Sequence, residues 1–271
     1  MNEHAFPSLS TTVRYTVSDA AVGVPRQDAA IVSDCLLTAN LSGIDSHGVG
    51  RLKYYYDRIQ RGQHQTETHF EIVKETETTA LIDGNHGTGH VIAYRAMKLA
   101  MDKARRYGMG SVAVRNSTHF GIAGYYPLMA AKSGMLGLAV TNARPSIAPT
   151  FGTEPMLGTN PIAFAVPTDM PYPFCLDMAT SICQRGKIEV ADRAEKPVPE
   201  GWVIDDKAQP MTDAPAILEG LSSATAALLP LGSMAAAQCS PDFTGVTLNV
   251  STQNGPAIAS ALALWLLAVP G

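Results

Sequence analysis

The stretch GIDSHGVGR, residues 43–51, places a serine beside a histidine, with an arginine four residues after the histidine. Histidine titrates near neutral pH, so His47 could take a proton from a substrate or return one. A guanidinium binds a carboxylate through two parallel hydrogen bonds, which makes Arg51 a candidate substrate clamp. If a helix begins here, His47 and Arg51 share one face and Ser46 suits its N-cap. The same residues also fit a capped helix with an incidental surface histidine.

A second histidine occurs in RNSTHFG, residues 115–121, between a predicted strand and a predicted helix. Backbone N–H groups at the start of a helix are open to an anion, so His119 could lie beside a bound anionic group. The alternative is a loop histidine that is bonded to a neighbouring carbonyl.

Small and amide-bearing residues follow three further predicted strands, in TNARPSIAP, GTNPIAF and LDMATSICQRGK. Ligands collect at the carboxyl ends of strands in open α/β sheets, and such residues suit close approach to a dinucleotide. Ordinary turn chemistry is the alternative, because asparagine, proline and glycine are common turn formers. The sequence has no GxGxxG after a strand, and GNHGTG has the wrong spacing, so no Rossmann fingerprint is present. GxSxG and HExxH motifs are also missing, which disfavours hydrolases and metalloenzymes.

The elements that would position these residues alternate between helices and strands. Val32, Cys35, Leu36 and Ala39 recur at helical spacing and predict a helix over 25–40. Further predictions are a helix over 51–62 that Gly62 ends, a strand at 79–82, a long helix closed by Gly108, and strands in SVAVR, GLAVT, PIAFAVP and FCLDM. This alternation predicts an α/β fold with a partly parallel sheet.

Composition narrows the classes of partner. The 271 residues are 46% hydrophobic and 16% charged with a net charge of −4, which is typical of a globular protein. Because phosphate binding needs clustered lysine and arginine, nucleic acid is not expected as a partner. The N-terminus lacks the apolar segment of a secretory signal. The apolar stretch at 256–271 is 16 residues long, short of the roughly 20 that span a bilayer, so no membrane is expected.

The cysteines are widely scattered and form no CxxC pair, which gives no indication of a disulfide framework or a zinc site. We expect buried free thiols in a reducing cytosol, and no bound metal. The four cysteines are Cys35, Cys175, Cys183 and Cys239.

Five blocks together, in this order, resemble the type 2 malate/L-lactate dehydrogenase family. They are GIDSHGVGRL, DGNHGTGHVIAYRAM, VRNSTHFGIAGYY, TNARPSIAPTFGTEPMLGTNPIAFAVP and DMATSICQRGKIEVADRAEKPVPEGWVIDDKAQPMTD, within about residues 24–232. The resemblance implies an α/β fold: a three-layer mixed sheet with a nicotinamide-binding domain that is not Rossmann, plus a helical N-terminal substrate region. The expected domains are residues 1–75 for substrate and dimer contacts, 76–232 for the nicotinamide, and 233–271 as an atypical tail.

The resemblance also implies roles for individual residues. His47 would donate and accept the proton with Ser46 beside it, Arg51 would clamp the substrate carboxylate, and His119 would line the reaction centre, with the acid/base role in some relatives. Thr159 would lie near the substrate, and Lys187 is a further candidate there. The expected cofactor-binding residues are Asn142, Asn160, Pro161, Asp177, Met178, Ala179, Thr180, Ser181 and Ile182.

The implied activity is hydride transfer between NAD or NADP, with NAD favoured, and a small 2-hydroxy or 2-keto acid of the malate or L-lactate class. A cytoplasmic homodimer that binds a small carboxylate substrate is expected. One alternative is a cyclic-imine reductase, which Lys187 disfavours because imine-reducing relatives are expected to carry an acidic residue near that position. The other is a catalytically inactive homologue.

The tail motivates that last alternative. The family continues after the position of Gly232 with a glycine-rich KGYGL-type segment, whereas the 39 residues here contain one charged residue, Asp242. Our hypothesis from this departure is a truncated, frame-shifted or alternatively spliced terminus, which would remove part of the cofactor and interface surface.

Overall fold

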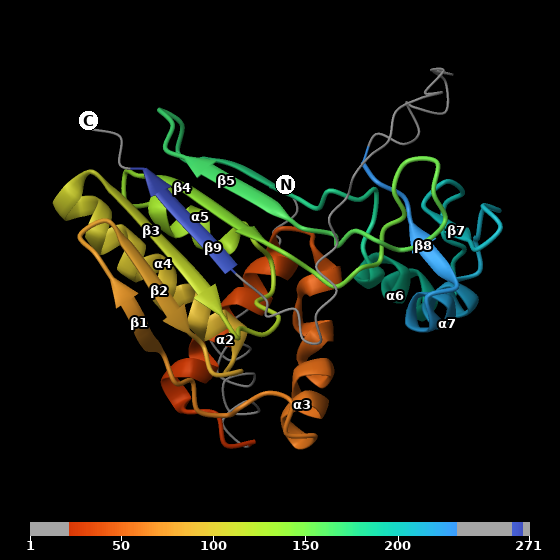
Figure 1. Ribbon diagram of the computed structural model, residues 1–271, viewed down its shortest axis with the longest axis horizontal. Coiled ribbons are helices and arrows are strands. Elements are labelled where there is room, and N and C mark those ends of the chain that lie inside the picture. Colours follow the sequence, from red (N-terminus) through yellow and green to blue (C-terminus); the bar gives the residue numbers. More distant parts are fainter. Residues whose placement is uncertain (1–21, 232–261, 268–271) are drawn as a thin grey trace, which may run out of the picture. The chain divides into compact units, whose positions relative to one another are not determined.

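The computed structural model describes residues 22–231 and 262–267 of the chain, which form two compact units (Figure 1). The sheet unit contains 22–142, 161–178 and 262–267 of these residues. The small unit contains 143–160 and 179–231. These units are defined by packing, and the expected division by function at residues 75 and 232 stays a prediction.

A seven-stranded sheet with the order β1-β2-β3-β9-β4-β5-β6 forms the frame of the sheet unit. Strands β2 and β3 are parallel, and every other neighbouring pair is antiparallel. The predicted α/β class with a mixed, partly parallel sheet is therefore confirmed. The strands are β1 (Glu71–Glu75), β2 (Thr79–Asp83), β3 (Met109–Arg115), β4 (Leu136–Thr141), β5 (Ile162–Val166), β6 (Phe174–Met178) and β9 (Leu262–Leu267).

Helices α4 (Gly89–Tyr107) and α5 (Tyr125–Ala131) cover one face of this sheet (Figure 1). Close approach explains a glycine in β3, because a Cβ on Gly110 would lie 2.0 Å from the carbonyl oxygen of Ala100 in α4. Alternation along β3 buries Val112 and Val114 against the helices. Gly108 ends α4 at a φ of +83°, a left-handed conformation that glycine adopts without strain.

Three elements at the start of the sheet unit carry the first candidate site. Helix α2 (Arg26–Leu41) packs against α4, and two short 3₁₀ turns, η1 (Asp45–His47) and η2 (Val49–Arg51), lead into α3 (Leu52–Gln60). The expected helix over 25–40 is thus confirmed. In the part of the chain that the structure describes, no helix is long and apolar enough to cross a membrane.

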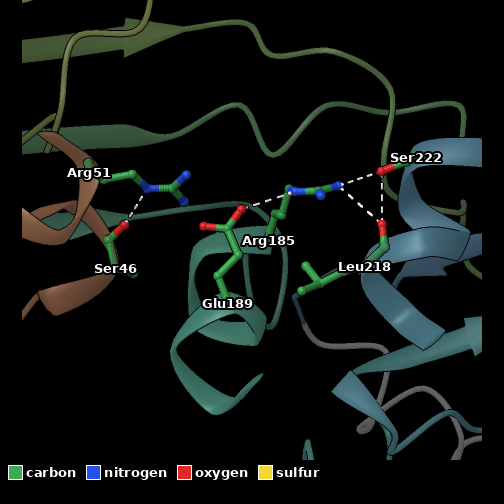
Figure 2. Close-up of polar contacts among 6 residues, drawn as sticks. All are labelled: Ser46, Arg51, Arg185, Glu189, Leu218 and Ser222. Carbon is green, nitrogen blue, oxygen red and sulfur yellow. Dashed lines mark hydrogen bonds and ion pairs between the residues drawn. The ribbon is translucent and has the colours of Figure 1, made fainter. Parts of the chain in front are cut away.

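The small unit has its own hydrophobic core between two helices and a two-stranded antiparallel sheet. Its elements are α6 (Arg185–Arg193), β7 (Val203–Asp205), α7 (Ala214–Ser223) and β8 (Ala226–Leu228). Arg185 joins the two helices: its Nη1 donates to Ser222 Oγ at 3.1 Å and to the Leu218 carbonyl at 3.4 Å, and its Nε donates to Glu189 at 3.1 Å (Figure 2).

The cysteine prediction is correct in part. Cys35 and Cys183 are buried free thiols, and burial raises the pKa of each to about 12. Cys175 is free but exposed on strand β6, so its expected burial is wrong. Cys239 lies outside the described residues. Most of the atypical tail also lies outside them, but residues 262–267 form β9 between β3 and β4.

Candidate active site

The segment around His47 is not the start of a regular helix. Gly48, with an extended ψ of −157°, separates η1 from η2, and α3 begins only at Leu52. The expected placement of His47 and Arg51 on one helical face is therefore wrong. Ser46 is not an N-cap either, because its hydroxyl lies 2.9 Å from Nδ1 of His47 within the first turn.

Two contacts fix this segment in place of a helical cap. Asn40, near the end of α2, accepts a hydrogen bond from the Val49 backbone N–H through its Oδ1 at 2.8 Å. Arg51 folds back, and its Nε donates to the Ser46 carbonyl oxygen at 2.8 Å (Figure 2). His47 and Arg51 thus stay close in space through a turn.

His119 lies in the loop between β3 and α5, as the sequence predicts. This loop passes very close to the start of α4, where a Cβ on Gly89 would be 2.2 Å from the Thr118 carbonyl oxygen. Its backbone N–H groups have intramolecular partners: Gly121 donates to His119 Nδ1 at 3.3 Å and Gly124 donates to the Asp177 carboxylate at 2.7 Å. The expectation that these donors are open to an anion is therefore wrong for Gly121 and Gly124.

The fold brings the two candidate histidines together. The rings of His47 and His119 stack with centroids 5.5 Å apart and an interplanar angle of 20°. Burial, and then the nearby Arg51 guanidinium, lower the pKa of His47 to about 4. Burial lowers the pKa of His119 well below its usual value, with His47 as the next largest cause. Both imidazoles are therefore neutral at pH 7, and in each ring one nitrogen donates a hydrogen bond and the other accepts one.

Sequence reasoning missed three residues of the same cluster, Tyr55, His64 and His90. The Tyr55 hydroxyl lies 2.7 Å from His119 Nδ1, and its ring meets the His90 ring edge-on at a centroid distance of 4.8 Å. Burial lowers the pKa of His64 to about 4 and that of His90 to about 3. A signal for Tyr55 was available, because Leu52, Tyr55 and Ile59 recur at helical spacing.

Several predicted cofactor residues meet at one end of the sheet. Ile162 pairs with both Val140 and Met178, so the end of β4, the start of β5 and the end of β6 coincide. Asn142, Pro161 and Met178 all lie at or next to this end. The loop after β3 leaves from the same end, since Val114 and Thr141 both pair with position 262 of β9. His119 and these residues therefore share the sheet end at which ligands gather in α/β folds.

The chain passes between the two units at 142–143, 160–161 and 178–179, which are positions next to predicted cofactor residues. Asn142 contributes a buried Oδ1 that has no hydrogen-bond partner among the described residues. Asp177 is engaged by Gly124, and burial raises its pKa.

The remaining predicted residues belong to the small unit, and most serve its internal bonding. Asn160 accepts from the Ala143 N–H at 2.9 Å, and the Thr159 carbonyl accepts from the Thr180 N–H at 2.9 Å. Lys187 is exposed, with its ammonium 5.5 Å from the centre of the Trp202 ring. The other three are Ala179, Ser181, whose hydroxyl donates to the Cys183 carbonyl, and Ile182, whose N–H donates to the Leu229 carbonyl.

Comparison with known proteins places this arrangement in a family. The family model described as malate/L-lactate dehydrogenase matches residues 14–240, most of the chain. This chain belongs to the malate/L-lactate dehydrogenase family. It is 51% identical over 211 residues to a malate dehydrogenase of Pyrococcus abyssi, an alignment that covers 78% of this chain and 57% of that protein. It is 44% identical over 212 residues to an L-sulfolactate dehydrogenase of Methanothermobacter thermautotrophicus, covering 78% of this chain and 60% of that protein.

Among solved structures, a malate dehydrogenase of Entamoeba histolytica superposes with a TM-score of 0.85 at 36% identity. The alignment covers 98% of this chain and 79% of that structure. By contrast, the chain aligns with only about 57–60% of the length of the curated family members above. Family membership and fold are thus shown, while the roles of individual residues stay predictions.

Proposed function

We propose that this chain is an NAD(P)-dependent oxidoreductase that transfers a hydride between nicotinamide and a small 2-hydroxy acid of the malate or L-lactate class. The observation that carries the proposal is the stacked pair of neutral histidines, His47 and His119, next to Arg51. Membership of the family supports the same reaction.

Oxidation of a secondary alcohol releases a hydride from carbon and a proton from oxygen. When bound, the nicotinamide supplies the hydride acceptor. His47 accepts the proton, and the neutral state of its ring at pH 7 is the state this step requires. Its Nδ1 faces the Ser46 hydroxyl, which leaves Nε2 as the atom that takes the proton. In the reducing direction the same atom returns it.

Arg51 binds the substrate carboxylate in this proposal. Its link to the Ser46 carbonyl uses Nε, so the position of the guanidinium is tied to the turn that carries His47. Holding the carboxylate beside the base directs the alcohol oxygen toward His47, and such orientation lowers the barrier. Thr159 and Lys187 are kept as further substrate contacts because of the family resemblance.

The residues at the sheet end fit a nicotinamide group. The buried Asn142 Oδ1 lacks a partner among the described residues, and a carboxamide NH₂ is a donor that would satisfy it. We assign cofactor contacts to Asn142 and, from the resemblance, to Asn160, Pro161 and the run 177–182. The preference for NAD over NADP belongs to the same proposal.

We also propose that the protein works in the cytoplasm as a homodimer. The exposed apolar side chains of Ile162, Phe174 and Leu176 on β5 and β6 support an interface, since monomers rarely expose such groups together. Light scattering of the purified chain measures the oligomeric state.

A substrate panel tests the activity. Malate, L-lactate, sulfolactate and ureidoglycolate are each assayed with NAD and NADP by the absorbance of the reduced cofactor. Turnover of at least one acid is expected. No turnover, together with no NADH binding at millimolar concentration by fluorescence titration, would support the inactive alternative.

Arg51→Lys tests the carboxylate clamp. Lysine keeps the charge but cannot form the paired hydrogen bonds, so KM for the acid should rise about tenfold or more, with KM for the cofactor nearly unchanged. Arg105→Lys is the matched control, because Arg105 pairs with Asp102 on the exposed side of α4. An unchanged KM for the acid in Arg51→Lys would rule out the clamp.

A further inference from the structure

Tyr55 lies at the centre of the histidine cluster and contacts three of its members. It is the buried residue of the short helix α3, held among Val32, Leu36 and Val91. Its ring centroid lies 4.8 Å from that of His90, 5.8 Å from that of His119 and 6.4 Å from that of His64. Its hydroxyl reaches His119 Nδ1 at 2.7 Å.

The same nitrogen has a second neighbour that decides the direction of the bond. The Gly121 backbone N–H donates to His119 Nδ1 at 3.3 Å, and a backbone N–H can only donate. A proton on Nδ1 would remove the acceptor of that N–H, so we assign Nδ1 as the bare acceptor nitrogen of the neutral ring. The Tyr55 hydroxyl therefore also donates to Nδ1, and the ring proton of His119 is on Nε2.

We infer that Tyr55 is a positioning residue that fixes His119 in the Nε2–H tautomer, so that His119 donates a hydrogen bond while His47 carries the proton. The inference rests on the proposed function for its catalytic consequence. An Nε2–H group can hold the alcohol or ketone oxygen of the substrate but cannot accept a proton from it. The family resemblance leaves the acid/base role open between the two histidines, and this geometry assigns it to His47.

The hydrogen-bond partner of His47 differs from that of His119, because it can accept a hydrogen bond as well as donate one. Its Nδ1 faces the Ser46 hydroxyl at 2.9 Å, and a hydroxyl both donates and accepts. The hydroxyl oxygen can accept from an Nδ1–H group, which leaves Nε2 bare to take the substrate proton, and the same bond persists in the imidazolium. The Gly121 N–H cannot accept a hydrogen bond, so this arrangement is not open to His119. His47 can therefore cycle between protonation states, whereas His119 is held in one.

Burial raises the pKa of the Tyr55 hydroxyl well above its usual value, which keeps it a donor throughout the neutral range. Donation to Nδ1 also stabilises the neutral ring of His119 over its charged form. Removal of the hydroxyl should therefore raise the pKa of His119 toward the ordinary value for histidine.

Nitrogen-15 NMR of the full chain, labelled at the histidine rings, tests the inference directly. A His119→Asn variant identifies the His119 resonances. In the unsubstituted protein at pH 7, His119 should show a protonated Nε2 and a bare Nδ1. In Tyr55→Phe, the Nδ1 resonance should shift and the His119 pKa should rise. Tyr125→Phe is the control, because it removes a tyrosine hydroxyl that donates to Asp34 at 2.6 Å instead.

A protonated Nδ1 in the unsubstituted protein overturns the inference, whether or not the variant folds. Unchanged His119 resonances in a folded Tyr55→Phe protein overturn it as well. In activity assays, Tyr55→Phe should lower kcat about 10–100-fold, the size of the loss when the hydrogen-bond partner that orients a metal-bound histidine is removed, and leave KM for NADH unchanged. If no acid is turned over while the NMR results hold, the proposed function fails and the tautomer assignment stands.

Discussion

The turn that carries His47 and the loop that carries His119 hold their histidines in different ways. At the turn, the contacts come from side chains: the Asn40 side chain accepts a hydrogen bond from the Val49 N–H, and the Ser46 hydroxyl lies beside His47 Nδ1. At the loop, backbone groups and a buried tyrosine surround His119. Side-chain hydroxyls and amides can rotate, whereas backbone groups in a packed core cannot. In the proposed function, this difference suits the turn to a histidine that changes its protonation state and the loop to one that does not.

The largest expected effect is at the turn. His47→Ala should lower kcat by two or more orders of magnitude, because in the proposed function it removes the group that takes the proton, and general acid–base catalysis typically contributes about 10²–10⁴-fold. NADH binding, followed by fluorescence titration, should stay largely intact.

His69→Ala is the control for this variant, since His69 is exposed and pairs only loosely with Glu67. A His47→Ala enzyme with near-normal kcat would refute the assignment of the proton to His47. It would also remove the functional contrast between the turn and the loop.

Both histidine segments could be found from the sequence, but their surroundings could not. His47 and His119 stand in short polar stretches next to predicted elements, and local rules identify such positions. The local pattern around Ser46 predicts a helix cap. The structure instead breaks the chain at Gly48, and that break depends on contacts with the Asn40 side chain that the pattern does not show. The meeting of Tyr55 with His90 requires α3 to pack against the start of α4, which no spacing in either segment shows.

The helices and strands also divide into those that the sequence predicts and those that it does not. Helix α4 was predictable because its hydrophobic spacing and its terminal Gly108 are local features. Strand β9 was not, because LALWLL is a continuous apolar run without alternation and lies far in sequence from its partners β3 and β4. Strand β1 was missed because EIVKE is exposed along its whole length. A strand whose formation depends on partners that are distant in the sequence has little signal for a strand in its own residues.

A pair of glycine substitutions tests the rigidity of the two segments. In Gly89→Ala the new Cβ would meet two backbone oxygens, of Thr118 at 2.2 Å and of His119 at 2.5 Å, and we expect a loss of about 3 kcal/mol in unfolding free energy. In Gly48→Ala the Cβ would meet the side chain of Asn40, with Oδ1 at 2.2 Å, and that side chain can rotate away. That rotation breaks the bonds of Asn40 to Val49 and to Asp45, so the loss there should be about 2 kcal/mol, at about 1 kcal/mol for each bond.

Urea unfolding followed by tryptophan fluorescence and circular dichroism measures both losses. Gly89→Ala should also displace the His119 loop and lower kcat, whereas Gly48→Ala should move mainly the turn. Equal losses for the two variants would mean that the loop yields as readily as the turn, and the contrast in rigidity would fail.

A last effect concerns acid, which charges the buried histidines of the cluster, among them His90 in α4. The folded pKa of His90 is about 3, below the unfolded value of about 6.5, so the unfolded chain binds more protons between these pH values. Stability from this group is complete above pH 6.5 and is lost as the pH falls toward 3. Between pH 7 and pH 5 the loss should be about 2 kcal/mol for one such histidine.

His90→Phe isolates that contribution. Neither ring nitrogen of His90 has a partner among the described residues, so a phenyl ring forfeits no hydrogen bond there. The variant should lose about 2 kcal/mol less than the unsubstituted protein when urea unfolding at pH 7 and pH 5 is compared. His69→Ala should follow the unsubstituted protein at both pH values. If His90→Phe keeps the full acid sensitivity, the protons enter at the other buried histidines, His47, His64 or His119, and His90 does not set the acid limit of the fold.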